Sequence, residues 1–212
     1  ASGLVLTGIF AYGGTKFPAL LNLMYSVGPG GSYSPTLFAW IVMLSPLAFI
    51  LVLNFGIQRM QASTAQAVFW IFSAIMGLSL THIFIVYTGA SITRVFFITA
   101  GTFAAMSLYG YTTKRDLSKF GSFLFMGLIG IIIASVVNIF MQSSAMAFVI
   151  SVIGVLVFVG LTAHDTQNIK RMYIEGEQSE TATKKAVMGA LSLYLDFLNL
   201  FMMLLHLFGD RR

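Results

Sequence analysis

Apolar residues fall into seven long runs along the chain, and each run is long enough to cross a membrane as a helix. About 20 apolar residues span the hydrocarbon core of a bilayer. None of the runs alternates apolar and polar residues as a barrel strand does. Lys16 and Pro18 interrupt the first run, which makes it the weakest. The sequence therefore predicts an all-α membrane protein with one transmembrane domain over residues 1–212 and spans at 4–23, 38–55, 68–87, 95–111, 120–141, 145–163 and 187–208.

The composition supports the prediction of a membrane protein. Hydrophobic residues make up 58% of the chain and charged residues 9%, whereas about a quarter of the residues in a soluble domain are charged. So few charges cannot cover a water-facing surface, and lipid must be the solvent of this fold. The chain has no cysteine, which excludes disulfides, thiolate metal sites and cysteine nucleophiles.

Lysine and arginine are distributed unevenly between the two sides of the predicted membrane domain. Eight lie in the connections after the second, fourth and sixth runs, and three lie on the opposite side. Because basic residues accumulate in cytoplasmic loops, we expect a cytoplasmic N-terminus. The C-terminus then lies outside, unless the last run is re-entrant and returns it to the cytoplasm. The same bias explains the net charge of +5 without a nucleic-acid partner.

Asp196 is the one acidic residue deep within a predicted span. It follows the start of the last run by nine residues, or ~13 Å along a helix. A carboxylate at that depth costs ~3 kcal/mol or more unless it is paired, hydrated or protonated. It belongs to a stripe of small and polar residues that predicts a central last helix and a pore-lining face, formed by Gly189, Ser192, Asp196, Asn199, Met203 and His206. The alternative is that Asp196 only hydrogen-bonds a neighbouring helix.

Asp165 is a second candidate, at the end of the sixth run and near the predicted cytoplasmic boundary. The sixth and seventh spans are consecutive and antiparallel, so Asp165 and Asp196 can share one site. Two neighbouring carboxylates cannot both ionise cheaply and would tend to hold one proton between them. Their oxygens also suit a hard cation such as Ca²⁺, for which protons would compete. The sequence thus predicts an ion- and proton-sensing pair.

Other chemistry finds little support in the sequence. There is no Gly-x-Ser-x-Gly, His-Glu-x-x-His or Walker sequence, so we expect neither an enzyme nor a required cofactor. The three histidines are scattered, which makes a zinc site improbable. His164 precedes Asp165 by one residue, and their side chains are expected to diverge by ~100° on a helix.

Three segments resemble a known family. Residues 193–201 (Leu-Tyr-Leu-Asp-Phe-Leu-Asn-Leu-Phe) resemble the last-helix motif of the Bax inhibitor-1 family, also called the TMBIM family. Residues 164–170 (His-Asp-Thr-Gln-Asn-Ile-Lys) are similar to the family's Asp-containing end of the sixth helix, and 114–118 (Lys-Arg-Asp-Leu-Ser) to its preceding loop. The resemblance covers essentially the whole chain and fits the bacterial, YccA-like branch best.

The resemblance implies a seven-helix fold with an enclosed last helix, in a bacterial inner membrane. It also implies a di-aspartyl site that gates a pH-sensitive calcium leak, with Asp165 and Asp196 matching the two aspartates. Arg59 resembles the basic residue that latches an aspartate in the closed form, although its neighbours depart from a basic cluster and it can also be read as a positive-inside anchor.

Two hypotheses of function therefore stand. The first is a passive, proton-regulated Ca²⁺ leak channel. The second, from a bacterial subgroup of the family, is a non-conducting regulator of a membrane-bound AAA protease that acts through a cytoplasmic N-terminal tail. Lipid is a partner of the chain in both.

Overall fold

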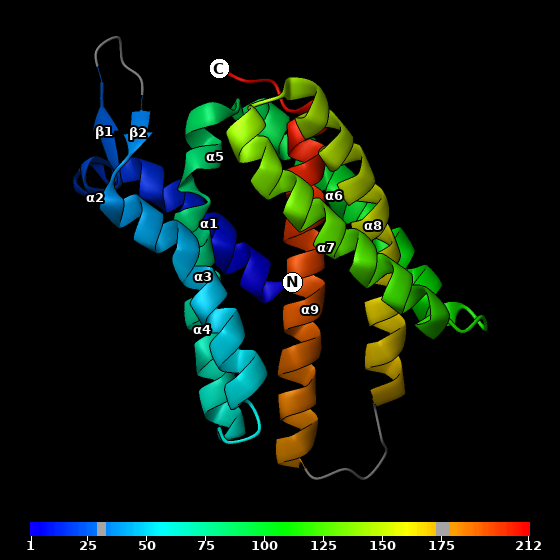
Figure 1. The fold of residues 1–212 in the computed structure, drawn as a ribbon. Coiled ribbons are helices and arrows are strands. Elements are labelled where there is room, and N and C mark those ends of the chain that lie inside the picture. Colours follow the sequence, from blue (N-terminus) through cyan, green and yellow to red (C-terminus); the bar gives the residue numbers. More distant parts are fainter. Residues whose placement is uncertain (29–32, 173–178) are drawn as a thin grey trace. The chain divides into compact units, whose positions relative to one another are not determined.

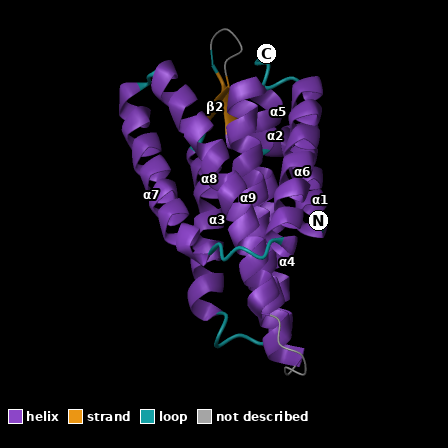
Figure 2. Ribbon diagram, turned by 90° about the vertical axis from the view of Figure 1, so that its right-hand side faces the viewer, coloured by secondary structure: helices purple, strands orange, loops and turns teal. Residues whose placement is uncertain are grey.

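Helices make up nearly all of the computed structural model, which describes residues 1–28, 33–172 and 179–212 (Figure 1; Figure 2). One short antiparallel strand pair interrupts them, β1 (Tyr25–Val27) with β2 (Tyr33–Pro35), in the register Ser26 opposite Ser34. The helices are α1 (Ser2–Lys16), α2 (Pro18–Met24), α3 (Leu37–Gly56), α4 (Ala62–Ser79), α5 (Thr81–Val86), α6 (Gly89–Thr112), α7 (Ser118–Met141), α8 (Ser144–Met172) and α9 (Ser179–Phe208). The predicted all-α class is confirmed.

Six of the described spans are long and apolar enough to cross a membrane: α3, α4 with α5, and α6 to α9. The predicted first span, 4–23, differs from the structure. It consists of two helices bent by 92° at Phe17 and becomes a seventh span only if the pair is counted as one. The cause is Pro18, which lacks an N–H and disfavours helical geometry in the residue before it. Phe17 accordingly has an extended backbone.

The last two helices are longer than their apolar runs. α8 continues beyond residue 163 to Met172, with Lys170 and Arg171 in its last turn, where cations favour the helix dipole. α9 begins at Ser179, well before residue 187, and its first turns carry a Glu180–Lys184 pair at 3.1 Å with the favourable i,i+4 spacing. Both extensions are polar, which is why hydrophobicity alone did not predict them.

The chain divides into two compact units. Unit 1 contains α1 to α5, the strand pair, α9 up to Met188, and Arg212. Unit 2 begins at Gly89 and contains α6, α7, α8 and the remainder of α9 from Gly189. Since α9 belongs to both units, a single transmembrane domain remains our prediction for the chain.

Unit 1 is held by close contacts between α1 and α4. The Thr7 hydroxyl on α1 lies 2.9 Å from the Ser73 carbonyl oxygen on α4. Gly77 on α4 leaves no room for a Cβ, which would meet the Thr7 carbonyl oxygen at 2.5 Å. Small residues that let helix backbones approach closely are a common packing device in membranes.

Small residues also allow close helix packing in unit 2. Gly110 on α6 lies directly against the backbone of Ala163 on α8, and Gly160 on α8 accommodates Leu124 of α7. Phe197 of α9 meets two rings of α6 edge to face, Phe96 at 5.7 Å and Phe103 at 5.4 Å. These contacts hold the three helices around the C-terminal half of α9 (Figure 1).

The exposed surface of the helices is strongly apolar. On α7, Phe123 is 70% exposed and Phe140 83% exposed, as expected for side chains that face lipid. In α9, by contrast, 56% of the most apolar window is buried, against at most 33% in the other five spans. The prediction of an enclosed last helix is therefore confirmed.

Candidate functional site

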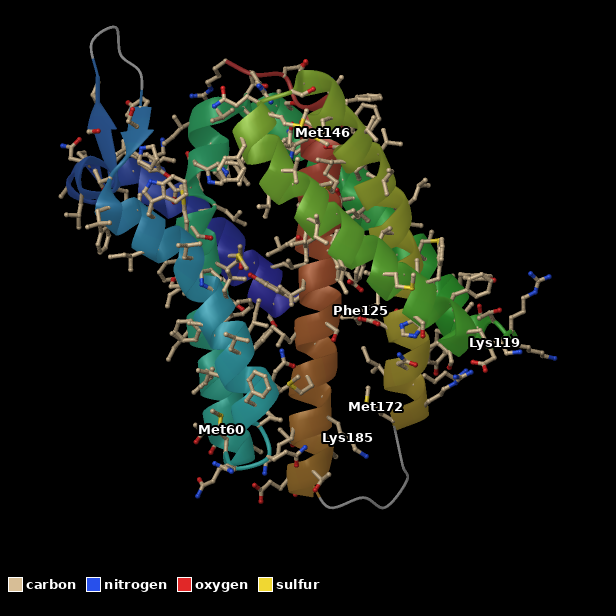
Figure 3. The ribbon with its side chains drawn as sticks, in the orientation of Figure 1. Met60, Lys119, Phe125, Met146, Met172 and Lys185 are labelled. Atoms are coloured by element: carbon tan, nitrogen blue, oxygen red, sulfur yellow. The ribbon has the colours of Figure 1, made fainter. Side chains whose placement is uncertain are left out.

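A cavity of about 330 Å³ lies between α7, α8 and α9 within unit 2. Its apolar lining includes Phe125 of α7, which is labelled in Figure 3. Its polar lining comes from α8 and α9. The complete set is Gly121, Phe125, Leu128, Phe158, Leu161, His164, Asp165, Ser192, Leu195, Asp196 and Asn199.

Asp196 is buried in this cavity, with 5% of its surface exposed. Its Oδ2 has no hydrogen-bond partner among the residues that the structure describes. A dry, ionised carboxylate in such a place would be very costly. The cavity has room for several waters, each of which needs ~30 Å³, so water or a proton can satisfy the acid.

Asp165 lines the same cavity from α8. Its side chain is 23% exposed, and its Oδ1 lies 3.0 Å from Nδ1 of His164. Asp165 on α8 and Asp196 on α9 therefore line one cavity from two sides. The two acids that the sequence singled out are thus brought together, one on each of two antiparallel helices.

His164 also belongs to the site, which the sequence reasoning missed. We expected its side chain to diverge from that of Asp165, and the 3.0 Å contact shows that this expectation was wrong. The ~100° between adjacent residues describes their Cβ directions, and the longer side chains bend back toward each other. Two neighbours hold the ring: the Asn168 amide nitrogen lies 3.2 Å from Nε2, and Gly121 on α7 leaves space for it.

Gln167 anchors the end of α8 that carries the site, a role that the sequence analysis did not predict. It is 5% exposed. Its Oε1 accepts from the Leu117 backbone N–H at 2.9 Å, and its Nε2 donates to the Arg115 carbonyl oxygen at 2.8 Å. No pattern in the sequence indicates these contacts, because they depend on how α8 lies against the α6–α7 loop.

An ion pair outside the membrane spans holds the loop between α6 and α7 against α8. Arg171 of α8 donates to Asp116 Oδ1 at 2.8 Å and to the Ser118 hydroxyl at 2.6 Å. The Ser118 backbone N–H, and after it the Arg171 guanidinium, lower the pKa of Asp116 from 3.8 to about 2. The loop therefore stays attached to α8 in mildly acidic conditions.

The predicted pore stripe is divided between two places. Ser192 and Asn199 line the cavity with the two aspartates. His206 instead lines a second cavity of about 500 Å³ at the other end of α7, α8 and α9. Met203, between them on the stripe, packs against Gly154.

Arg59 lies in unit 1, just after α3, and its backbone N–H donates to the Gly56 carbonyl oxygen at 2.9 Å. Asp165 and Asp196 both lie in unit 2. The latch between Arg59 and an aspartate stays a prediction.

Calcium prefers six to eight oxygen ligands. Within the described ranges, no group of three or more His, Cys, Asp or Glu side chains is placed to hold a metal ion. Asp165 and Asp196 can supply only part of a calcium shell, with water supplying the rest. A Ca²⁺ site at these two aspartates stays a prediction.

Six helices long and apolar enough to span a bilayer, and two aspartates that line one cavity between α7, α8 and α9, define an integral membrane protein with an intramembrane acidic site. The chain belongs to the Bax inhibitor-1 family: the family model described as "Inhibitor of apoptosis-promoting Bax1" matches residues 1–212. The resemblance in the sequence is confirmed.

Several bacterial proteins are similar to the chain. It is 47% identical over 215 residues to "Inner membrane protein YbhL" of Escherichia coli, covering 99% of this chain and 87% of that protein. It is 45% identical over 212 residues to the Rickettsia prowazekii protein RP147, covering 100% and 86%. A Borreliella burgdorferi protein is 43% identical over 211 residues, covering 99% and 88%.

Proposed function

We propose that this chain is a passive, proton-regulated cation leak of a bacterial inner membrane, with Ca²⁺ as a permeant ion and Asp165 and Asp196 as its sensor. The observation that carries the proposal is the pairing of these acids in one cavity, with Asp196 Oδ2 unpartnered among the described residues. The name of the Escherichia coli relative supports the inner-membrane location.

Charge is the basis of the mechanism. When both carboxylates are ionised, a cation between them reduces their electrostatic repulsion, and their oxygens act as its ligands. One proton shared by the pair relieves the repulsion and weakens cation binding. The His164 ring contacts Asp165 and is part of the same polar cluster. Proton concentration thereby controls whether the cavity accepts a cation.

The test is calcium flux into liposomes that contain the purified protein. Wild type should admit Ca²⁺, and Asp165→Asn should admit less because one ligand charge is gone. Asp210→Asn is the matched control: its carboxylate belongs to the same unit but pairs with Arg94 at the surface, at 2.8 Å. Equal flux in liposomes with and without protein would refute the leak, and the protease-regulator hypothesis would become the better account.

A further inference from the structure

The two cavities of unit 2 follow one line along α7, α8 and α9. On α8, Asp165 lines the first cavity and Ser151 the second, and Gly154 lies between the two sets of lining residues. On α9, Asn199 lines the first and His206 the second, with Met203 between them. Figure 3 labels Phe125 of α7, which lines the first cavity, and Met146 of α8, whose neighbour Ala147 lines the second.

Between the two cavities, Gly154 of α8 lies against Met203 of α9. A Cβ built on Gly154 would lie 2.8 Å from Sδ and 2.9 Å from Cγ of Met203. The Met203 side chain therefore fills the space that any larger residue at 154 would take. On α7, which is described throughout, Ile131 is the one buried residue, and it lies between the residues that line the two cavities.

This interval is short. Asn199 and His206 are seven residues apart, or ~10 Å along a helix, and Met203 lies in the middle. Polar residues line the cavities on both sides of Met203. The interval itself, at Met203, Gly154 and Ile131, presents only a thioether and aliphatic carbon. A constriction of this kind closes a pore by excluding water. Methionine suits a movable closure because its side chain is unbranched and flexible.

We propose that Met203 is the apolar gate of the conduction route and that the cavity at His206 is the second vestibule of that route. The proposal rests on the proposed leak function, which it deepens by naming the closed layer. A hydrated cation would pass from one cavity to the other when the Met203 side chain leaves its place against Gly154. The competing account is that Met203 only packs α9 against α8.

Because the chain has no cysteine, single cysteines can report water access without any flux measurement. The probes are Ser192→Cys in the first cavity and His206→Cys in the second, labelled by a membrane-impermeant thiol reagent in sealed membrane vesicles of each orientation. The vesicle side from which His206→Cys reacts defines the entrance of the second vestibule.

From that side, Ser192→Cys should react slowly with Met203 in place. Adding Met203→Ala should raise its labelling rate about tenfold or more, the effect of ~1.4 kcal/mol in a barrier. Met203→Leu keeps an apolar side chain of similar size, so it should leave the rate slow and show that the fold tolerates substitution here. The proposal is overturned if Met203→Ala and Met203→Leu label alike, or if His206→Cys reacts from neither side.

The outcome separates the two proposals. If labelling is unchanged by Met203→Ala while wild type conducts Ca²⁺, the leak exists and its gate lies elsewhere. If labelling rises while wild type conducts no Ca²⁺, the gated water route exists and the calcium assignment is wrong.

Discussion

At the scale of single residues, the sequence predicts some residues of the site and not the contacts that position them. Asp196 could be found from the sequence because an acid among apolar residues is conspicuous. His164 and Gln167 could not, because their roles depend on contacts with α7 and with the α6–α7 loop. A polar residue in a membrane helix can thus be found from the sequence, whereas the residues that it contacts cannot.

Gly121 should be essential to the position of His164. A Cβ at 121 would overlap Nε2 of that ring and lie 3.0 Å from Cε1. Gly121→Ala should therefore lower stability by about 1–3 kcal/mol, as overpacking does, and alter the pH dependence of flux by moving His164 from Asp165. Thermal unfolding in detergent and the liposome assay measure the two effects.

Gly130→Ala is the matched control on the same helix, because nothing lies within 4 Å of a Cβ there. It should be tolerated, with a gain of up to ~1 kcal/mol from helix propensity. If both alanines behave alike, the space at Gly121 is not what holds His164.

At the scale of elements, the sequence predicted which helices exist better than where they end. Apolar runs located α3 and α7 to within two residues at each end, and they missed the first six residues of α6. They missed the polar ends of α8 and α9, which are stabilised by ion pairs and helix-dipole contacts rather than by lipid. Pro18 indicated a break in the first run, but the size of the bend, 92° at Phe17, could not be read from the sequence.

The approach of α6 to α8 should tolerate no side chain at Gly110. A Cβ there would overlap the Ala163 carbonyl oxygen and lie 2.9 Å from its Cα. Backbone cannot rotate away as a side chain can, so Gly110→Ala should cost about 3 kcal/mol or more. Gly101→Ala, on the same helix and with nothing within 4 Å, should be harmless. Similar melting temperatures for the two variants would contradict this packing.

The ion pair between Arg171 and Asp116 should contribute nothing to the pH response at neutral pH. Because the pKa of Asp116 is lowered from 3.8 to about 2, its stabilising effect is present above about pH 3.8 and is lost as pH falls through about 2. The difference in melting temperature between wild type and Asp116→Asn should thus be small and constant from about pH 5 to 8. A difference that changes within that range would make this loop part of the sensor.

At the scale of the whole molecule, the two units separate the proposed latch from the proposed sensor. Arg59 belongs to unit 1 and the aspartates to unit 2. The composition and seven apolar runs were enough to predict an all-α membrane protein, because lipid imposes so strict a pattern. The pairing of helices within each unit was not predictable, since it depends on glycine contacts that hydropathy does not register.

Arg59→Ala tests the link between the units. A charge-assisted bond to an ionised aspartate would be lost, so calcium flux at neutral pH should rise, while the loss of flux on full protonation should remain. Arg115→Ala removes a basic side chain from the α6–α7 loop of unit 2 and should leave flux unchanged. If the two variants conduct alike, Arg59 is an interfacial anchor and not a latch.

The central claim is that Asp165 and Asp196 sense protons as one site, and the pH profile of Asp196→Asn tests it most directly. In wild type, protonation releases the latch but also removes the charge that attracts Ca²⁺, so flux into liposomes should peak at an intermediate pH. Asparagine mimics the neutral acid, so the variant should conduct less and its profile should lose that peak. If Asp196→Asn keeps the wild-type profile, the di-aspartyl account of this protein is wrong.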